Sequence, residues 1–418
     1  MISTTTSRGV AHALAERFAG AAHATARPVV ADIVRRRVFD ALGALAAGRG
    51  IADHALFAAL PERGLLADVR RLCAVIRSTE VDDLDRLSCT SPGSVAVPVS
   101  LLVAAWRGLG EEELLAGVAA GYEAMAGIGQ ALGGPHRLPD GVWPSYDAAP
   151  LAAAAASAAV LGLDGDRAAH ALAIAVARTP GRAGRIAGEP TSRWLGYGSA
   201  AADGVVATLA AEAGAHGDLA LLDLPALRVD PPPQAQWLVE RADVKPFCTA
   251  RQTQSAVEAA RMTAMDLQGA TIVEAEVAVP AAYRAMIDQP RPRTRLASIA
   301  SAQFQLSAAL TSEGVLWDVV RASPAPPAVA MRVIVDGRLS ALYPEAWPAR
   351  VRLRTAGGDE ATRTILGGDE PLPGWHQLFT KHARLGALAP PELDALRAAC
   401  RSIAPGELLH LADPERTR

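Results

Sequence analysis

The sequence predicts a mostly α-helical fold, in which a large all-α domain is joined to a smaller α+β domain. Three observations predict it. Apolar residues recur at helical spacing from residue 7 to about residue 217, without strand-like alternation of any length. After about residue 262, short segments alternate between apolar and polar residues, as half-buried strands do. Hydrophobic residues make up 50% of the chain and aromatic residues only 4%, so the core must consist of Ala, Leu and Val, which suits closely packed helices.

Helices are predicted wherever apolar residues recur every three or four positions. The acidic residues in Gly110-Glu-Glu and Asp164-Gly-Asp166 mark two helix starts, because negative charge is favourable at a helix N-terminus. The apolar run 148–163 is short for a membrane span and contains Pro150, so we expect a buried helix there. The predicted helices are residues 10–18, 29–47, 95–109, 111–132, 148–161, 166–177 and 199–213.

The α+β part is predicted from three alternating segments with helical patterns between and after them. The expected strands are residues 271–279, 329–335 and 349–355, and the expected helices are residues 301–313 and 392–403. A Pro-rich segment, residues 221–236, is expected to cross the surface between elements. These patterns divide the chain into an all-α domain, an α+β domain and a C-terminal helical segment that returns to the first domain, over residues 1–262, 263–375 and 376–418.

Charge and cysteine usage exclude several classes of function. The net charge is −3 and no basic tract occurs, which argues against nucleic acid or an anionic membrane as a partner. The four cysteines are widely spaced, without a Cys-x-x-Cys or His-x-x-x-His pair, so we predict neither a disulfide framework nor a metal site, and no cofactor. The N-terminus has no basic region followed by an apolar core, so we expect a cytoplasmic protein.

The densest group of acidic residues lies in the stretch from Arg77 to Gly93. Glu80, Asp82, Asp83 and Asp85 precede a Ser-Pro-Gly turn and the apolar run that follows it. One interpretation is a solvated loop whose acids cap the next helix. The other is a polar pocket, where carboxylates beside a cation take part in proton transfer.

Lys245 is the best single candidate for acid/base chemistry. It follows Val244 and precedes Pro-Phe, just before a helix expected to start near Thr253. Apolar neighbours desolvate an amine and make it easier to deprotonate, so that it can exchange protons near neutral pH. The alternative is a lysine that reaches solvent or pairs with Asp243. Arg251, near the same helix start, can bind a carboxylate, or else form a salt bridge with Asp243 or Glu258.

A series of short motifs resembles the MmgE/PrpD family, in the same order along residues 8–400. Each motif is weak alone, but their shared order makes the resemblance fairly specific. The acid-rich stretch ending in Ser-Pro-Gly resembles the family's Asp-x-Asp-Asp run followed by His-Pro-Gly. The others are Gly121–Glu123, Gly141–Ser145, Gly188–Gly198, Lys245–Cys248, Met286–Pro290, Ala302–Phe304 and Pro371–Pro373.

The resemblance implies an all-α domain that carries an α+β lid, with the site between them. It also implies a homodimer and a cofactor-independent lyase that acts on a small carboxylate substrate. The family's active-site lysine matches Lys245. Arg193 stands where the family usually carries another lysine, in a loop before the next helix; it keeps the charge but cannot pass on a proton, so we assign it to anion binding.

Several departures from the family pattern bear on the reaction. Ser91, Trp143 and Gln254 occupy positions where the family usually has histidine, and none of these side chains titrates near neutral pH. The nearest remaining histidine is His136, which either enters the pocket from its loop or is simply solvated. These losses count against ordinary dehydration of 2-methylcitrate or decarboxylation of cis-aconitate.

The resulting prediction is a lyase- or isomerase-type enzyme of this family. Lys245 is the expected general acid/base, with Asp82 and Asp83 orienting it or sharing its proton and Glu80 beside them. Arg193 and Arg251 are expected to hold an anionic group. Ser91, Trp143, Tyr146, Gln254 and His136 are the other expected pocket residues. We predict a diverged step of specialised metabolism, such as cyclisation, dehydration or epimerisation. Two alternatives stay open: an ordinary hydro-lyase, or an inactive member that serves as a binding subunit, which an exposed Lys245 far from the acids would favour.

Overall fold

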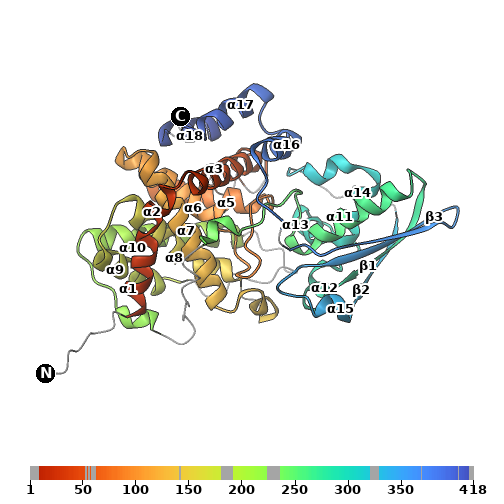
Figure 1. The fold of residues 1–418 in the computed structure, drawn as a ribbon, viewed down its shortest axis with the longest axis horizontal. Coiled ribbons are helices and arrows are strands. Elements are labelled where there is room, and N and C mark those ends of the chain that lie inside the picture. Colours follow the sequence, from red (N-terminus) through yellow and green to blue (C-terminus); the bar gives the residue numbers. More distant parts are fainter. Residues whose placement is uncertain are drawn as a thin grey trace.

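The computed structural model describes residues 9–51, 54, 57, 63–140, 143–179, 192–223, 236–320, 329–368, 370–402 and 404–413. Helices of the N-terminal half gather at one end of the molecule, and a four-stranded sheet lies at the other end (Figure 1). The fold is therefore mostly α with a smaller α+β part, as the sequence predicts. No helix among the described residues combines the length and apolar character that crossing a membrane requires.

The helical part confirms the periodicity of the first half of the sequence. Its helices are α1 (Val10–Ala19), α2 (Ala21–Thr25), α3 (Pro28–Gly48), α5 (Leu65–Ser78), α6 (Gly93–Arg107), α7 (Glu111–Ala131), α8 (Pro144–Val160), α9 (Gly165–Val176) and α10 (Ser192–Glu212). A 3-10 helix, η1 (Gly134–Asp140), follows α7. Among the α-helices, α5 was not predicted, although one of its faces is buried at helical spacing by Val69, Leu72, Cys73 and Ile76.

The start of α10 corrects one prediction. We expected this helix from residue 199, with the preceding residues in a loop, but it begins at Ser192. Trp194 and Tyr197 are buried on its inner face, and this burial extends the helix toward its N-terminus. Gly198 lets α10 approach α5 closely, because a Cβ there would lie 2.0 Å from the carbonyl oxygen of Arg70. Residues 188–191 of the same motif lie outside the described part of the chain.

Alanine builds the centre of the helical part. Ala149, Ala152, Ala153 and Ala156 of α8 are fully buried, and α8 packs on both α7 and α10. Short side chains allow helix axes to lie close together, so a core poor in aromatic residues still packs densely.

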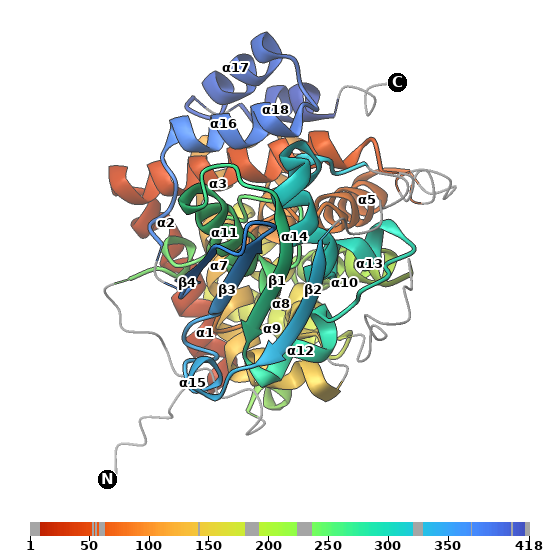
Figure 2. The same ribbon diagram turned by 90° about the vertical axis from the view of Figure 1, so that its right-hand side faces the viewer.

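The α+β part begins with α11 (Arg251–Asp266) and contains a sheet in the order β2-β1-β3-β4, which faces the viewer in Figure 2. β1 runs parallel to β2 and antiparallel to β3, and β3 runs antiparallel to β4. The elements are β1 (Ile272–Val279), α12 (Ala281–Ile287), α13 (Arg295–Ala300), α14 (Ala302–Thr311), β2 (Ala330–Val335), α15 (Gly337–Ser340), β3 (Ala349–Thr355) and β4 (Glu360–Ile365).

The two faces of the sheet differ in polarity. Val277, Val351 and Leu353 are buried in a second hydrophobic cluster, beneath α11 and α14. The other face carries ion pairs such as Arg354 with Glu274. β4 was not predicted, because its residues are mostly exposed and lack apolar alternation. The second cluster also includes Phe247, which precedes the expected domain boundary at residue 263.

The C-terminal helices lie against the helical part. They are α16 (Trp375–Leu385), α17 (Pro390–Ala399) and α18 (Pro405–Ala412), and they pack against α3 and α6 at the top of Figure 1. Leu378, Leu396 and Leu408 bury their side chains in the first hydrophobic cluster. α17 corresponds to the helix predicted over residues 392–403, and residue 403 lies outside the described residues.

Candidate active site

Residues 80–85, here called the acid segment, join α5 to the turn before α6. Leu84 and Asp243 exchange two backbone hydrogen bonds of 2.9 Å, which align the acid segment with the segment that carries Lys245. The two segments come from positions far apart in the sequence, and this pairing brings the acidic side chains to the lysine.

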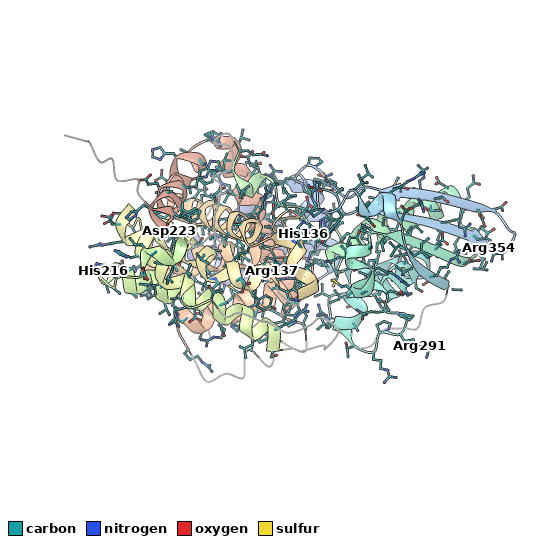
Figure 3. The ribbon with its side chains drawn as sticks, turned by 90° about the horizontal axis from the view of Figure 1, so that it is seen from below. His136, Arg137, His216, Asp223, Arg291 and Arg354 are labelled. Carbon is teal, nitrogen blue, oxygen red and sulfur yellow. The ribbon has the colours of Figure 1, made fainter. Side chains whose placement is uncertain are left out.

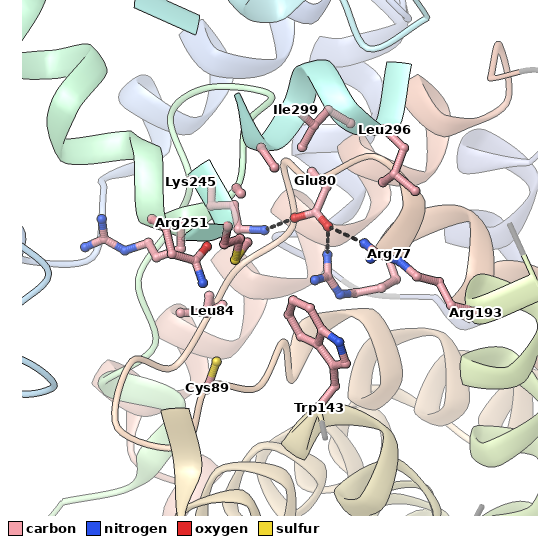
Figure 4. A pocket seen from close by; sticks show the side chains of 14 residues that line it. Arg77, Glu80, Leu84, Cys89, Trp143, Arg193, Lys245, Arg251, Leu296 and Ile299 are labelled. Atoms are coloured by element: carbon pink, nitrogen blue, oxygen red, sulfur yellow. Dashed lines mark hydrogen bonds and ion pairs between the residues drawn. The ribbon is translucent and has the colours of Figure 1, made fainter. Parts of the chain in front are cut away.

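Glu80 and Asp82 both accept hydrogen bonds from Lys245. The Nζ atom lies 2.8 Å from Oε2 of Glu80 and 3.1 Å from Oδ1 of Asp82. Glu80 also pairs with Arg77 at 2.9 Å and lies 3.7 Å from Arg193, so its carboxylate joins three cations (Figure 4). The side chain of Lys245 has no exposed surface. Lys245 is thus neither exposed nor remote from the acids, which weighs against the inactive alternative.

The other two acids of the segment have structural partners. Asp83 accepts a hydrogen bond of 2.9 Å from the backbone N–H of Gly93, at the start of α6, and another from the hydroxyl of Tyr122. Asp85 binds Arg241 and the backbone N–H of Ser88. The acid segment is buried and is therefore not the solvated loop of the first interpretation, although Asp83 does cap the next helix. The second interpretation, a polar pocket with acids facing a cation, agrees with the contacts of Glu80 and Asp82.

The charged cluster formed by Arg77, Glu80, Asp82, Arg193 and Lys245 holds more positive than negative groups. Arg77, Arg193 and Lys245 supply three cations against the two carboxylates of Glu80 and Asp82. Burial alone raises the pKa of Glu80, but the charges of Arg77, Lys245 and Arg193 outweigh it and hold this pKa well below its ordinary value. Glu80 therefore stays ionised, and the cluster keeps one positive charge that can attract an anion.

Arg193 is the cation with the fewest partners. Its Nε and Nη1 atoms are buried without a hydrogen bond, and its guanidinium lies 3.9 Å from the ring centre of Trp194 and 5.5 Å from that of Trp143. Burial lowers the pKa of Arg193, because Tyr146 and Glu80 compensate its charge only in part. A buried guanidinium with free donors, stacked on aromatic rings, is suited to binding a carboxylate.

These groups surround a small cavity, here called the inner cavity, between the helical part and the α+β part. Arg77, Glu80, Arg193 and Lys245 form its charged end. Met286, Leu296 and Ile299, which belong to α12 and α13, form an apolar end. Leu84 also lines the cavity, but Figure 4 shows it on the other side of Glu80 from Leu296 and Ile299. The free volume is about 30 Å³, which is room for about two water molecules.

Cys89 also lines the inner cavity, at a position that the sequence did not single out. Burial raises the pKa of its thiol to about 12. A thiol that remains protonated is a poor nucleophile, so the cavity offers no thiolate for covalent chemistry.

Arg251 lines the inner cavity, but its guanidinium points away from Glu80 (Figure 4). It lies 3.3 Å from Asp243, which also pairs with Arg86 at 2.8 Å. The salt bridge that the sequence left open as an alternative is therefore present. Burial raises the pKa of Asp243 to about 6 despite these two arginines.

Gln254 lies outside the inner cavity. Its amide donates to the carbonyl oxygens of Phe247 and Thr249, both at 3.0 Å, and so fixes the turn that follows Lys245. It lines a larger outer cleft of about 540 Å³, which lies beside α11 and α16. Arg251 and Lys245 border both spaces.

Three further predicted residues occupy different places. Ser91 and Tyr146 are buried close to the cluster, and each hydroxyl lacks a hydrogen-bond partner. Burial raises the pKa of Tyr146 to about 12, and the nearby charges of Arg193 and Arg77 oppose this shift. His136 is exposed on η1 and does not line the inner cavity (Figure 3).

Lysine usage is a signal that the sequence analysis missed. Only two of the 41 Lys and Arg residues are lysines, Lys245 and Lys381. Both are buried, and both pair with buried acids. A chain that otherwise uses arginine places lysine only where a compact amine is held in the interior. Arg77 was also missed, although its spacing of three residues from Glu80 across the end of α5 favours a pair.

Residues 71–227 match the family model described as the MmgE/PrpD N-terminal domain. This match supports membership of the chain in the MmgE/PrpD family and agrees with the motifs of the resemblance that lie within these residues. It covers the acid segment, Trp143 and Arg193, and it ends before Lys245. No curated protein matches the chain.

Proposed function

We infer that this member of the MmgE/PrpD family is a dehydratase- or lyase-like enzyme whose acid/base group is Lys245. The observation that carries the proposal is the position of Lys245: a fully buried amine within hydrogen-bond distance of Glu80 and Asp82, at the edge of the inner cavity. A buried lysine that is hydrogen-bonded to two carboxylates can give a proton to a bound substrate and take one from it.

Elimination of water from a hydroxy acid needs two proton transfers. One proton leaves the carbon next to the carboxylate or carbonyl, and one proton joins the departing hydroxyl. Lys245 first passes a proton to Asp82, 3.1 Å away, which leaves the net charge of the cluster unchanged. The neutral amine then accepts the proton from carbon and passes it to the departing hydroxyl, so Lys245 serves both steps. Glu80 and Asp82 then orient the amine, since Glu80 remains ionised at neutral pH. Isomerisation, epimerisation or ring closure starts from the same first transfer.

The charge of the cluster and the walls of the cavity favour a substrate with a single anionic group. One positive charge is left in the cluster, and Arg193 has free donors for a carboxylate. The apolar end formed by Met286, Leu296 and Ile299 suits a hydrocarbon part rather than further carboxylates. We therefore propose a small monocarboxylate with an apolar body, rather than a tricarboxylate such as 2-methylcitrate.

The inner cavity must widen before such a substrate enters. Its free volume of about 30 Å³ holds only water. Because one end belongs to α12 and α13 and the other to the helical part, separation of these two parts opens it. The predicted lid domain, the homodimer and the cytoplasmic location remain proposals that accompany this function.

The test is a screen for loss of water, followed by mass spectrometry. Wild-type protein, Lys245→Ala and Arg17→Met would be incubated with 2-methylcitrate, cis-aconitate and a panel of branched β-hydroxy monocarboxylates. Arg17 also pairs with a buried acid, Glu123, but outside the site, so Arg17→Met controls for the loss of a buried ion pair. We expect turnover of a monocarboxylate by wild type and Arg17→Met, with at least about a hundredfold loss in Lys245→Ala.

Two outcomes contradict parts of this proposal. Turnover of 2-methylcitrate in preference to every monocarboxylate would show ordinary hydro-lyase chemistry without the family's histidines. Turnover that survives in Lys245→Ala would remove Lys245 from the chemistry.

A further inference from the structure

The backbone at Glu80 adopts a conformation that is rare for residues other than glycine. Its φ angle is +57°, in the left-handed region, although the residue is not glycine. Such a conformation costs about 1–2 kcal/mol and persists only where surrounding contacts fix it. The carboxylate of this residue joins Lys245, Arg77 and Arg193, so the contacts that fix the backbone also determine the site.

Groups from distant parts of the chain bind the backbone on either side of Glu80. Cys248 donates to the carbonyl oxygen of Thr79 at 3.1 Å, and Arg295 of α13 donates to that of Ser78 at 2.9 Å. On the other side, Lys381 of α16 donates to the carbonyl oxygen of Val81 at 2.7 Å. Val81 stands between the two acids that bind Lys245, so its carbonyl is the contact closest to both.

Lys381 is itself held by a buried acid. Its Nζ lies 2.7 Å from Oδ1 of Asp40 on α3, and Nε2 of His382 lies 2.9 Å from the same oxygen. Burial raises the pKa of Asp40, but the charge of Lys381 and the contact with His382 outweigh it and bring this pKa to about 2. Asp40 is therefore ionised, and it anchors the ammonium group between α3 and the acid segment.

A compact amine suits this position better than a guanidinium does. Asp40 and Val81 approach a single nitrogen, each at 2.7 Å, and the side chain is 6% exposed. The carbonyl oxygen of Val81 belongs to a fully buried residue, so losing its donor leaves an unsatisfied polar group in the interior. The simplest relief is a shift of the acid segment, which moves Glu80 and Asp82 relative to Lys245.

We propose that Lys381, anchored by Asp40, is a positioning residue that holds the acid segment in the conformation in which Glu80 and Asp82 both bind Lys245. The two lysines of the chain thus act on opposite sides of one segment: Lys245 binds its side chains, and Lys381 binds its backbone. The proposal rests on the proposed function, because it assigns Lys381 a part in arranging the proton-transfer group. It also makes the C-terminal helix α16 necessary for the site.

The presence of only two lysines allows a direct test by NMR without a substrate. Protein labelled with [¹³Cε]lysine should give two side-chain signals, and Lys381→Gln should leave only the signal of Lys245. We expect this signal to move from its wild-type position. We also expect carbamylation of Lys245 by cyanate, measured by mass spectrometry against the N-terminal amine, to become at least about tenfold faster through local opening.

Control variants separate positioning from stability. Lys381→Arg keeps donors near Val81 but fits the position less well than a compact amine, so it should restore part of the wild-type protection of Lys245. Arg17→Met should leave the Lys245 signal and its carbamylation rate unchanged, although it too removes the partner of a buried acid. If Lys381→Gln does not fold, Asp40→Asn takes its place, since it keeps Lys381 but removes its anchor, and it should shift the same signal.

The proposal is overturned if Lys381→Gln, or Asp40→Asn in its place, lowers the stability of the protein while the Lys245 signal and carbamylation rate stay at their wild-type values. That result would make Lys381 a purely structural residue. Because the measurement involves no turnover, it is independent of the proposed function: a Lys245→Ala variant that retains activity removes the function and leaves this result intact.

Discussion

Arg193 shows how a change of residue alters what a site can do. The resemblance places a lysine here in the family, and the guanidinium that replaces it is always charged and stacks on Trp143 and Trp194. The same resemblance implies a histidine at the position of Trp143. By this resemblance, Arg193 and Trp143 stand in place of two side chains that can transfer protons. They provide instead a permanent cation and an aromatic ring on which it stacks. The two substitutions are consistent with binding an anion and not with titration near neutral pH.

Arg193→Met should abolish the binding of small carboxylates. We expect propanoate, but not propanamide, to raise the melting temperature of the wild-type protein, because a ligand that binds only the folded state stabilises it. Arg193→Met should lose this stabilisation, and Arg193→Lys should retain part of it, since charge-assisted hydrogen bonds contribute about 1.5–3 kcal/mol. Equal stabilisation of Arg193→Met and wild type would contradict the assignment.

Asp83 makes stability depend on pH in the direction opposite to most acids. Burial raises its pKa from 3.8 to about 6, despite the opposing contacts of Arg37, Tyr122 and Gly93. The folded state thus holds this proton more tightly than the unfolded chain does. The stability that this group contributes is fully present below pH 3.8 and is lost as the pH rises through about 6.

Asp83→Asn tests this sign, because the amide cannot ionise. Relative to wild type, the variant should gain stability as the pH rises from about 4 to about 7, by up to roughly 3 kcal/mol. Urea unfolding of both proteins across this range measures the difference. Parallel stability curves would show that Asp83 keeps an ordinary pKa in the folded state.

The sequence predicted the residues of the site better than their partners. Glu80, Asp82 and Lys245 could be singled out because acids and a lysine stand among apolar neighbours. Which acids bind Lys245 and which have a structural role could not be predicted, because Asp83 contacts Gly93 and Tyr122 only once α6 and α7 have packed. His136 was suggested by its type and its nearness in sequence, and the structure leaves it exposed on η1.

At the scale of elements, periodicity located most of those that bury one clear face. α1, α3, α6, α7, α8 and α9 match the predicted ranges to within a few residues, and so do β1, β2 and β3. α5 was missed although it buries one face, and two other missed elements gave no local signal. β4 is mostly exposed and so has no apolar alternation, and α16 positions the site through Lys381, a contact that no local pattern shows.

The packing of α16 on α3 depends on a glycine. Gly43 faces the ring of His382, and a Cβ at this position would lie 2.3 Å from Nδ1. We therefore expect Gly43→Ala to lower the free energy of unfolding by about 1–3 kcal/mol, through overpacking beside Asp40 and Lys381.

Urea unfolding of Gly43→Ala measures this cost. Gly165→Ala serves as a control, because a Cβ at residue 165 meets no atom within 4 Å. Equal stability of the two variants would show that α16 shifts to accommodate the methyl group, in which case the contact with His382 does not fix the position of Lys381.

At the scale of the whole molecule, the site lies between the helical part and the α+β part, where Ile299 of α13 is buried in the first hydrophobic cluster and Met286 packs against both clusters. The helical part supplies Arg77, Glu80 and Arg193, and the α+β part supplies Met286, Leu296 and Ile299. Lys245 lies on the connecting segment between them. Each part therefore contributes one end of the inner cavity, which accounts for the weakness of every local motif: no single segment contains the site.

The central claim is that Lys245 transfers a proton to or from carbon. The measurement that tests it most directly is deuterium uptake in D₂O by the substrate that the screen identifies, compared between wild type and Lys245→Arg. Arginine keeps the charge and the donors but cannot release its proton near neutral pH. We expect uptake at a single carbon by wild type and none by Lys245→Arg, with substrate binding largely retained. Equal uptake by both proteins would show that another group moves the proton and that Lys245 only holds the acid segment in place.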